Sequence, residues 1–501
     1  MGVAMCCATP AIAGEPATPP GTDELGPAFR YTTKADRDGL RVAVEEVGIL
    51  GLGFLQYVTN KKANQADWDL APDWSSVERK ATFQALTFDN NYFDTNWLTH
   101  PGAGYLYYSA ARQNRLSIAS SFAIALGAST LWEVFGEIRE HAAINDIIAT
   151  PVTGLALGEP TLQLGALMHR SAKSPASTLL GWALAPFKSL HDALDDVTPA
   201  RAERTDHLGV AADVWHRLSR GTSVGVTHQE DGLTQGDGRL HGSARIVSIP
   251  GYGFAGRRRG WFDGGEVSEL SAQAAYAEAR FVDVQLAAHT LPFGWATQDV
   301  TTDPSGRLAG HGTYVGLQVG CEYGHHDWDR DRRRPVNKIA LVATGATLEH
   351  RIHTGDWTLR ARVDGLLDFA GVDAYALGEE RREHSDIHLV SVLRMKGYYH
   401  AYGATLRPRV EAENGAFDTG GDLRVDWFQS ITGHDVEPIN TNTSFDASDR
   451  RVLGRTWVGW RVTPALRVSL EGEWGERTGR ITTNHASRSE LGVHGGAEVR
   501  F

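Results

Sequence analysis

The stretch that decides the fold is Leu491–Phe501, which reads L-G-V-H-G-G-A-E-V-R-F. Alternate positions from Leu491 to Phe501 carry Leu, Val, Gly, Ala, Val and Phe, whereas the positions between them carry Gly, His, Gly, Glu and Arg. The side chains of a β-strand point alternately to two sides. The stretch therefore predicts a strand with one apolar face and one polar face.

The same alternation recurs upstream, and the polar positions are rich in Arg, Asp and Glu. It is clearest at 357–364, 402–411, 423–427 and 466–474. A charged face of both signs suits a closed barrel that has lipid outside and self-paired charges in its lumen. A soluble β-sandwich, with its polar face in water, is the alternative.

Connection lengths also favour a barrel. Short turns are expected at 354–356 and 462–465, and long polar connections at 324–336, 433–450 and 476–489. Alternating short and long connections are typical of the periplasmic turns and extracellular loops of membrane barrels. Residues 204–501 are predicted to form about twelve strands, and an even number is expected.

A final strand that ends on Phe501 resembles the C-terminal insertion signal of bacterial outer-membrane β-barrels. The resemblance implies the bacterial outer membrane as the location. It also implies membrane lipids and lipopolysaccharide as contacts, and the barrel-assembly machinery as a partner through the C-terminal strand. The net charge of −12 argues against a nucleic-acid partner. No cofactor is expected.

The N-terminal residues predict export. Ala11-Ile12-Ala13 has the small-x-small pattern of a signal-peptide cleavage site, so residues 1–13 are interpreted as a truncated signal peptide and 14–37 as a flexible leader. A lipoprotein that is acylated at Cys6 or Cys7 is the less favoured alternative. Cys321 would then be the only cysteine of the mature chain, which precludes an intramolecular disulfide.

Residues 38–200 predict a helical domain, which makes the fold class an α+β membrane protein with its barrel at 204–501. Residues 116–132 approach the length of a membrane span, but a buried helix is the favoured interpretation. The domain is expected to be periplasmic or to plug the lumen. Its apolar segments are 42–58, 104–114, 116–138, 144–168 (interrupted by Pro151 and Pro160) and 178–194.

Four motifs gather in this helical region: N-W-x-x-H-P at 96–101, Y-Y-x-A-A-R at 107–112, W-E-x-x-G-E at 132–137, and I-N-D…T-P…G-E at 144–159. They resemble an uncharacterised bacterial family, domain of unknown function 3943, over about residues 85–170. The resemblance implies a Gram-negative envelope protein and carries no activity.

The same motifs hold the candidate functional residues. Glu133 and Glu137 share one face if they lie on a helix, and with His100 they form a candidate catalytic set for a lipid-processing hydrolase or transferase. No H-E-x-x-H motif is present, and no metal site is assigned. Candidate ligand-binding residues are Asn96, Tyr105, Arg112, Asn145, Asp146 and Glu159.

The favoured alternative is that these groups satisfy one another. Arg112 would pair with Glu133 or Glu137, Asn145 or Asp146 would cap the following helix, and Pro101 would open a helix. Under this interpretation the protein is a non-catalytic envelope barrel that passes or binds solute or lipid, and the enzyme is the alternative.

Other features have simpler interpretations. Gly221–Gly225 matches G-x-S-x-G, but no helix is predicted after the serine, so the match is interpreted as chance. The loop at 324–335, with His325 and His326, could bind metal or lipopolysaccharide phosphates, although plain solvation is favoured. A lumen filled by paired charges is predicted from Arg360, Arg362, Arg407, Arg409 and Arg424 beside Asp364, Glu411 and Asp426, and the alternative is that these arginines select anionic solutes.

Overall fold

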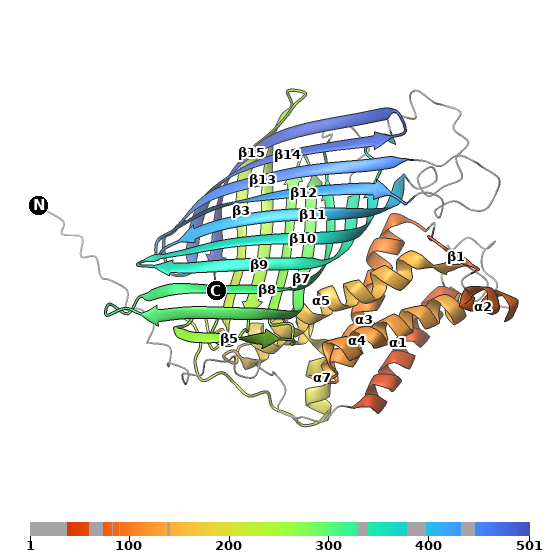
Figure 1. The fold of residues 1–501 in the computed structure, drawn as a ribbon, viewed down its shortest axis with the longest axis horizontal. Coiled ribbons are helices and arrows are strands. Elements are labelled where there is room, and N and C mark those ends of the chain that lie inside the picture. Colours follow the sequence, from red (N-terminus) through yellow and green to blue (C-terminus); the bar gives the residue numbers. More distant parts are fainter. Residues whose placement is uncertain are drawn as a thin grey trace, which may run out of the picture.

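The structure is a computed structural model that describes residues 38–59, 74–82, 84–89, 91–137, 141–328, 338–377, 397–431 and 446–500. The predicted signal peptide, the predicted leader and Phe501 lie outside the described residues. Within them, a helical part is followed by a β-barrel (Figure 1).

The helical part is built around one long helix. Its elements are α1 (Gly39–Thr59), α2 (Trp74–Ala81), β1 (Leu86–Thr87), the π-helical turn η1 (Thr95–Thr99), α3 (His100–Gln113), α4 (Ile118–Leu131), the π-helical turn η2 (Trp132–Gly136), β2 (Ala142–Ala143), α5 (Ile144–Arg170), α6 (Pro175–Leu184) and α7 (Pro186–Leu194).

Helix α5 differs from its prediction, because it continues without a break through Pro151 and Pro160. An internal proline costs a helix about 3 kcal/mol, but α5 is packed on several sides. It crosses α3 so closely that a Cβ on Gly104 would lie 1.8 Å from the Thr150 carbonyl oxygen. This packing offsets the lost hydrogen bonds. The predicted segment 178–194 instead divides into α6 and α7 at Pro186.

Twelve of the thirteen strands of the sheet form a barrel that closes on itself, which confirms the predicted fold class and excludes the sandwich. Closure is made by β15 with β3 and by β7 with β8, and the short β5 pairs only with β7. The strands are β3 (Trp215–Gln229), β4 (Thr234–Val247), β5 (Gly256–Phe262), β6 (Val267–Ala277), β7 (Arg280–Thr302), β8 (Leu308–His326), β9 (Lys338–Thr354), β10 (Trp357–Asp373), β11 (Tyr398–Glu413), β12 (Phe417–Ser430), β13 (Ala447–Arg461), β14 (Leu466–Ile481) and β15 (Asn484–Arg500).

The two ends of the barrel differ in their connections. The end that contains Arg500 carries the short turns at 303–307, 355–356, 414–416 and 462–465. The opposite end carries the long connections that follow β8, β10 and β12. One predicted loop is wrong: residues 476–489 continue β14 and β15 and turn at 482–483. Polar residues were a poor guide there, because strand ends near the barrel rim are themselves polar.

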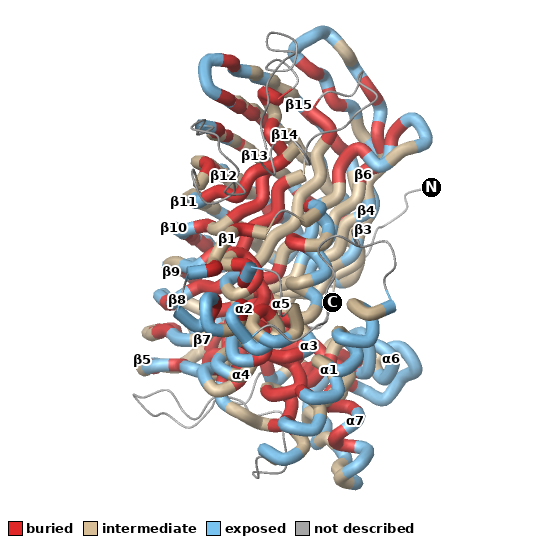
Figure 2. The backbone as a smooth tube through the Cα atoms, turned by 90° about the vertical axis from the view of Figure 1, so that its right-hand side faces the viewer, coloured by how far each residue is buried: buried red, intermediate tan, exposed pale blue. Residues whose placement is uncertain are grey.

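The helical part packs on the outside of the barrel wall, so the lumen-plugging alternative is wrong for the described residues (Figures 1 and 2). Trp97 and Phe93 pack with Ala340, Val342 and Tyr398. These wall residues alternate with the charged lumen positions of β9 and β11, such as Glu349 and Glu411, and therefore face outward. A second contact joins apolar residues of α5 to β4 and β6 through Leu164, Leu167, Met168, Ile246 and Leu270.

Candidate functional site

One candidate site lies where three separate segments of the helical part meet. Asp89 follows β1, His100 begins α3, and Asp146 lies in the first turn of α5. His100 Nε2 is 3.7 Å from Asp146 Oδ2. One ligand atom from each of the three residues lies within 4.8 Å of the other two, which is close enough for a metal ion to contact all three.

Asn145 holds the two aspartates in place. Its Nδ2 donates to Asp146 Oδ1 at 2.8 Å, and its Oδ1 accepts from the Asp89 backbone N–H at 2.7 Å. Neither Asn145 nor Asp146 caps α5, because Ala143 occupies the N-cap position. Pro101 does lie in the first turn of α3, as predicted.

The barrel wall completes this site from the outside. His400 Nε2 on β11 contacts the Asp89 carbonyl oxygen at 3.0 Å, and the Tyr398 hydroxyl donates to the Asn91 carbonyl at 2.8 Å. Asn96 Nδ2 links the two sides, because it lies 3.1 Å from the Tyr398 hydroxyl and 3.3 Å from the Asp89 carbonyl. The Asp89 segment is thus fastened to the wall.

Negative charge dominates the electrostatics of this site. Burial raises the pKa of the Asp146 carboxyl well above its usual range, and the charges of Asp89 and Glu137 raise this pKa further. Burial also lowers the pKa of the His100 imidazole to about 4, so the ring is neutral at pH 7. The site therefore combines a neutral imidazole with carboxylates that repel one another.

The two predicted catalytic glutamates lie at the edge of this site. Glu133 is buried, and its Oε2 accepts from the Ala143 backbone N–H at 2.8 Å. Glu137 Oε1 instead accepts from Trp132 Nε1 at 3.1 Å. Lys80 Nζ donates to the backbone carbonyls of both glutamates. His100, Glu133 and Glu137 therefore have different immediate partners.

A second group of predicted residues forms a separate buried cluster. Arg112 makes a bidentate pair with Glu159, with Nε–Oε2 and Nη2–Oε1 distances of 2.8 and 3.0 Å. Tyr108 and Gln163 each donate to the same carboxylate at 2.8 Å. The predicted pairing of Arg112 with Glu133 or Glu137 is wrong, because α5 brings Glu159 to Arg112 while those glutamates lie near Lys80.

The remaining predicted residue, Tyr105, makes no contact with the ionisable groups of either cluster among the described residues: its hydroxyl donates to the Leu184 carbonyl at 3.5 Å and lies near Ser109 and Thr161. Sequence reasoning missed Asp89, Lys80 and His400. Asp89 lies in the polar D-N-N sequence, which looks like an ordinary turn, and His400 is on a barrel strand far away in the chain. Nothing local marks either residue as part of the site.

The lumen offers a different kind of environment, in which charges pair across the barrel. Arg245 of β4 pairs with Glu349 of β9 at 2.5 Å, and Arg217 of β3 pairs with Glu413 of β11 at 2.6 Å. The predicted paired lumen is therefore observed. Other pairs are Arg360–Glu411, Arg362–Asp364, Arg424–Asp426, Arg407–Asp422 and Arg409–Glu411.

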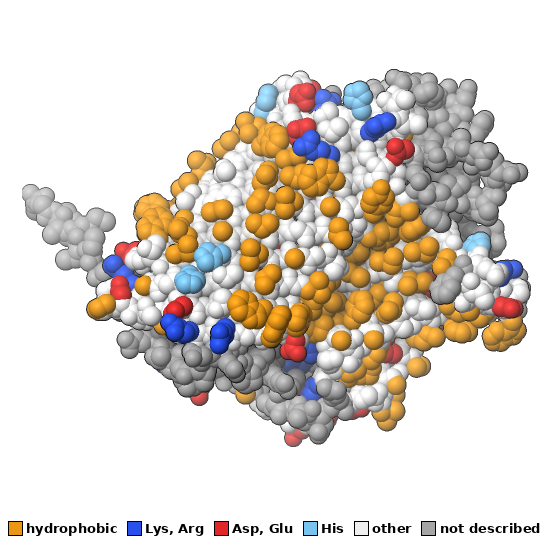
Figure 3. Space-filling model, in the orientation of Figure 1, with side chains coloured by type: hydrophobic (Ala, Val, Ile, Leu, Met, Phe, Trp, Pro, Cys, Tyr) orange, Lys and Arg blue, Asp and Glu red, His pale blue; other side chains and the backbone are white. Residues whose placement is uncertain are grey.

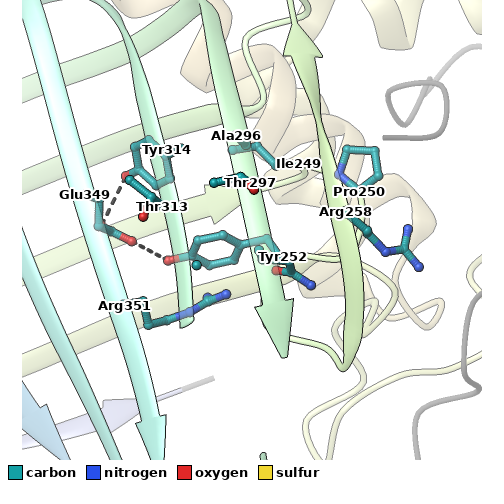
Figure 4. Close-up of a pocket in the computed structure, with 12 residues that line it drawn as sticks. Ile249, Pro250, Tyr252, Arg258, Ala296, Thr297, Thr313, Tyr314, Glu349 and Arg351 are labelled. Carbon is teal, nitrogen blue, oxygen red and sulfur yellow. Dashed lines mark hydrogen bonds between the residues drawn. The ribbon is translucent and has the colours of Figure 1, made fainter. Parts of the chain in front are cut away.

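Apolar clusters occupy part of the lumen near both ends. At the short-turn end, the connection after β4 folds inward, and the Tyr252 hydroxyl donates to Glu349 at 2.6 Å (Figure 4). Tyr252 belongs to an apolar cluster with Ile249, Phe262 and Tyr314. At the other end, a cluster includes Ala374, Ala376 and Leu377 from the connection after β10, packed with inward residues of the strands. A polar cavity of about 420 Å³ lies between charged lumen residues.

Two motifs from the sequence have structural explanations here. Ser223, the serine of G-x-S-x-G, lies in the middle of strand β3 and lines the lumen cavity, so no nucleophile elbow is formed. His326 ends β8 and contacts Asp283 at 2.9 Å and Glu490 at 2.7 Å. Residues 329–335 of the predicted binding loop lie outside the described residues.

Comparison with known proteins supports the family resemblance. Residues 85–187 match the family described as domain of unknown function (DUF3943), which confirms the resemblance predicted from the motifs. Curated proteins give no match.

Solved structures of membrane barrels also align with the chain. The β-domain of the Bordetella autotransporter BrkA is 11% identical, and the alignment covers 57% of this chain and 99% of that one at a TM-score of 0.24. The KdgM porin is 11% identical, and its alignment covers 55% of this chain and 97% of that one at a TM-score of 0.21. The translocator domain of the Neisseria meningitidis autotransporter NalP is 9% identical, and its alignment covers 65% of this chain and 98% of that one at a TM-score of 0.20.

The class of this membrane protein therefore follows from its own architecture. A closed antiparallel barrel with an even number of strands, an apolar exterior and a charged interior is the form in which chains cross the bacterial outer membrane. The protein is an outer-membrane β-barrel with a helical N-terminal part.

Proposed function

We propose that this protein is a closed envelope barrel that binds membrane lipid on a surface shared by its wall and its helices, and that it does not pass solute through its lumen. The observation that carries the proposal is the continuity of exposed apolar side chains from the wall onto the helical part (Figure 3). Such a surface needs an apolar solvent, and lipid chains supply one.

The exposure of individual side chains supports this proposal. Leu470 on the wall is 61% exposed, and Val47 and Leu52 on α1 are 70% and 69% exposed. By length and composition, helix α1 and residues Ile118–Gly136 are each long and apolar enough to cross a membrane. We infer that their exposed faces contact lipid chains, as the outward face of the wall does.

The place where the helices dock on the wall favours a position at the level of the membrane over the predicted periplasmic position. The helices contact β8–β11 close to the ends of these strands that carry the long connections, at residues such as Tyr323, Ala340 and Tyr398. Helix α5 also contacts Ile246 of β4 and Leu270 of β6, which lie towards the short-turn end. Long connections are extracellular in bacterial barrels. The helical part would then lie beside the wall at the level of the membrane.

The ion pairs and apolar clusters inside the lumen argue against solute passage. Arg–carboxylate pairs cross its middle, and apolar clusters occupy both ends. In planar bilayers we expect no stepwise ion conductance from the purified protein, with a porin as the positive control. Stable conductance steps would overturn the non-conducting part of the proposal.

Spin-label accessibility tests the lipid-binding part. Nitroxide labels are placed at Leu52→Cys on α1, at Leu470→Cys on the wall and at Ser305→Cys in the turn after β7, in a chain that lacks the native cysteines. In liposomes, we expect the label at position 52 to collide with oxygen as often as the label at 470 and to be shielded from a water-soluble nickel complex. Accessibility equal to that at 305 would contradict lipid contact.

A second candidate function is lipid processing by His100, Glu133 and Glu137. The observation that favours it is the neutral imidazole of His100 beside the buried carboxylate of Asp146. A chain with His100→Ala, Glu133→Ala and Glu137→Ala should then change the lipid composition of the envelope. Unchanged composition, with the barrel inserted normally, would end this candidate.

A further inference from the structure

We propose that Asp89, His100 and Asp146 bind one divalent transition-metal cation, of the kind to which Zn²⁺ belongs. The inference goes beyond the proposed function, because metal binding at this site depends neither on lipid contact nor on the lumen.

The donor geometry is the first argument. A metal with ligand bonds of about 2.0–2.4 Å holds its ligand atoms about 3–4.8 Å apart. The three ligand atoms lie within 4.8 Å of one another, and His100 Nε2 and Asp146 Oδ2 are separated by 3.7 Å. This last distance is too long for a hydrogen bond and suits two atoms that share an ion.

The unmet bonding capacity of Asp146 is the second argument. Its side chain is almost completely buried, at 1% exposure. Oδ1 accepts from Asn145, whereas Oδ2 faces His100 Nε2 at 3.7 Å, which is beyond hydrogen-bond distance. Burying a carboxylate costs free energy unless its oxygens are hydrogen-bonded or bound to a cation. A cation between Asp146 and His100 would satisfy it.

The balance of charge is the third argument. Asp89 and Asp146 lie close together, and Glu133 is buried within electrostatic range of both. Lys80 lies within electrostatic range of Glu133, and its Nζ donates to the backbone carbonyls of Glu133 and Glu137. Buried carboxylates are normally paired or bind metals. A bound divalent cation would neutralise this excess of negative charge.

The donor types select the class of metal. Ca²⁺ and Mg²⁺ prefer oxygen ligands alone, whereas an imidazole with carboxylates suits zinc and its transition-metal neighbours. Three protein ligands also leave one position of a tetrahedral ion for water or another oxygen donor.

The surroundings already hold these ligands in position. Asn145 donates to the Asp146 carboxylate and accepts from the Asp89 backbone N–H. His400 on β11 contacts the Asp89 carbonyl oxygen and so holds the Asp89 segment against the wall. Hydrogen bonds that orient the ligands of a metal in this way typically contribute 10- to 100-fold to metal affinity. The ion would therefore join α3, α5 and the Asp89 segment, which is itself fastened to the wall.

The test measures binding of zinc to the full chain in detergent, purified without a histidine tag. After dialysis against buffered Zn²⁺, we expect one zinc per chain by elemental analysis. We expect Asp146→Asn and His100→Ala to weaken zinc binding at least tenfold in a chelator competition. Asn145→Ala should weaken it 10- to 100-fold.

Asp94→Asn is the matched control, because Asp94 is a nearby carboxylate that is 60% exposed and pairs with Lys338 outside the site. Its zinc affinity should equal that of the unaltered chain. No zinc in the unaltered chain, or full affinity in both ligand variants, would overturn the proposal.

X-ray absorption of the zinc-loaded unaltered chain keeps the proposal testable if the variants do not fold. One imidazole nitrogen with oxygen donors at about 2.0–2.2 Å is the expected coordination. Coordination by two or more imidazoles, or by sulfur, would place the zinc elsewhere and contradict the proposal.

Discussion

At the scale of single residues, buried charge is what separates the two clusters. Glu159 is fully buried and well supplied with partners, because Arg112, Tyr108 and Gln163 all donate to it. Asp146 is equally buried but lacks a cation among the described residues. The first arrangement stabilises the packing of α3 on α5, whereas the second is the kind of site that binds something.

Replacing Arg112 tests the structural role of the first cluster. Arg112→Met leaves Glu159 buried without a cation, and breaking a buried pair in this way costs about 3–5 kcal/mol. We expect a loss of this size in the free energy of unfolding, followed by the helical circular dichroism signal during a denaturant titration.

Arg41→Met is the control for this substitution, because the Arg41–Asp195 pair is closer to the surface and should contribute only about 0–1 kcal/mol. Equal losses in the two variants would show that the Arg112–Glu159 pair is not the stabilising contact that its burial indicates.

At the scale of elements, the sequence was informative about strands and less so about packing. Alternation identified β10, β11, β12, β14 and β15 because lipid and lumen demand opposite side chains. The resemblance at 85–170 likewise located the helical motifs. It could not reveal that Arg112 pairs with Glu159, or that Asp89 joins His100, because both contacts depend on how α3 and α5 cross.

Close packing of the helices on the barrel wall requires a small residue at the contact, and Gly371 on β10 is the clearest example. A Cβ at this position would lie 2.1 Å from Trp97 Nε1. We expect Gly371→Ala to weaken docking of the helical part by about 1–3 kcal/mol, the usual cost of overpacking. Limited proteolysis should then cleave the helices faster while the barrel stays intact.

Gly365 provides the matched control, because it lies on the same strand and the same outward face, with open space where its Cβ would be. Gly365→Ala should leave the rate of proteolysis unchanged. Equal rates in the unaltered chain and both variants would mean that Trp97 does not pack on the wall.

At the scale of the whole molecule, the structure assigns different environments to the two faces of the wall. The inner face is bridged by ion pairs and carries apolar clusters, and the outer face is covered partly by the helices and otherwise exposes apolar side chains. The sequence could not predict this division of the outer face. An outward position is apolar whether it contacts a lipid chain or a tryptophan of the helical part. The alternation of apolar and polar residues therefore predicted the barrel but not the helices on its outer face.

Photo-crosslinking in intact cells tests docking of the helical part on the outer wall most directly. A benzoylphenylalanine at position 369 replaces Phe369, whose ring centroid is 5.4 Å from that of Trp97 and 6.0 Å from that of Phe88. At position 367 it replaces Leu367, which faces outward on the same strand and is exposed. We predict that the probe at 369 crosslinks to peptides from residues 88–97 and that the probe at 367 does not. Absence of these peptides at 369, in a chain whose barrel is inserted, would contradict the account.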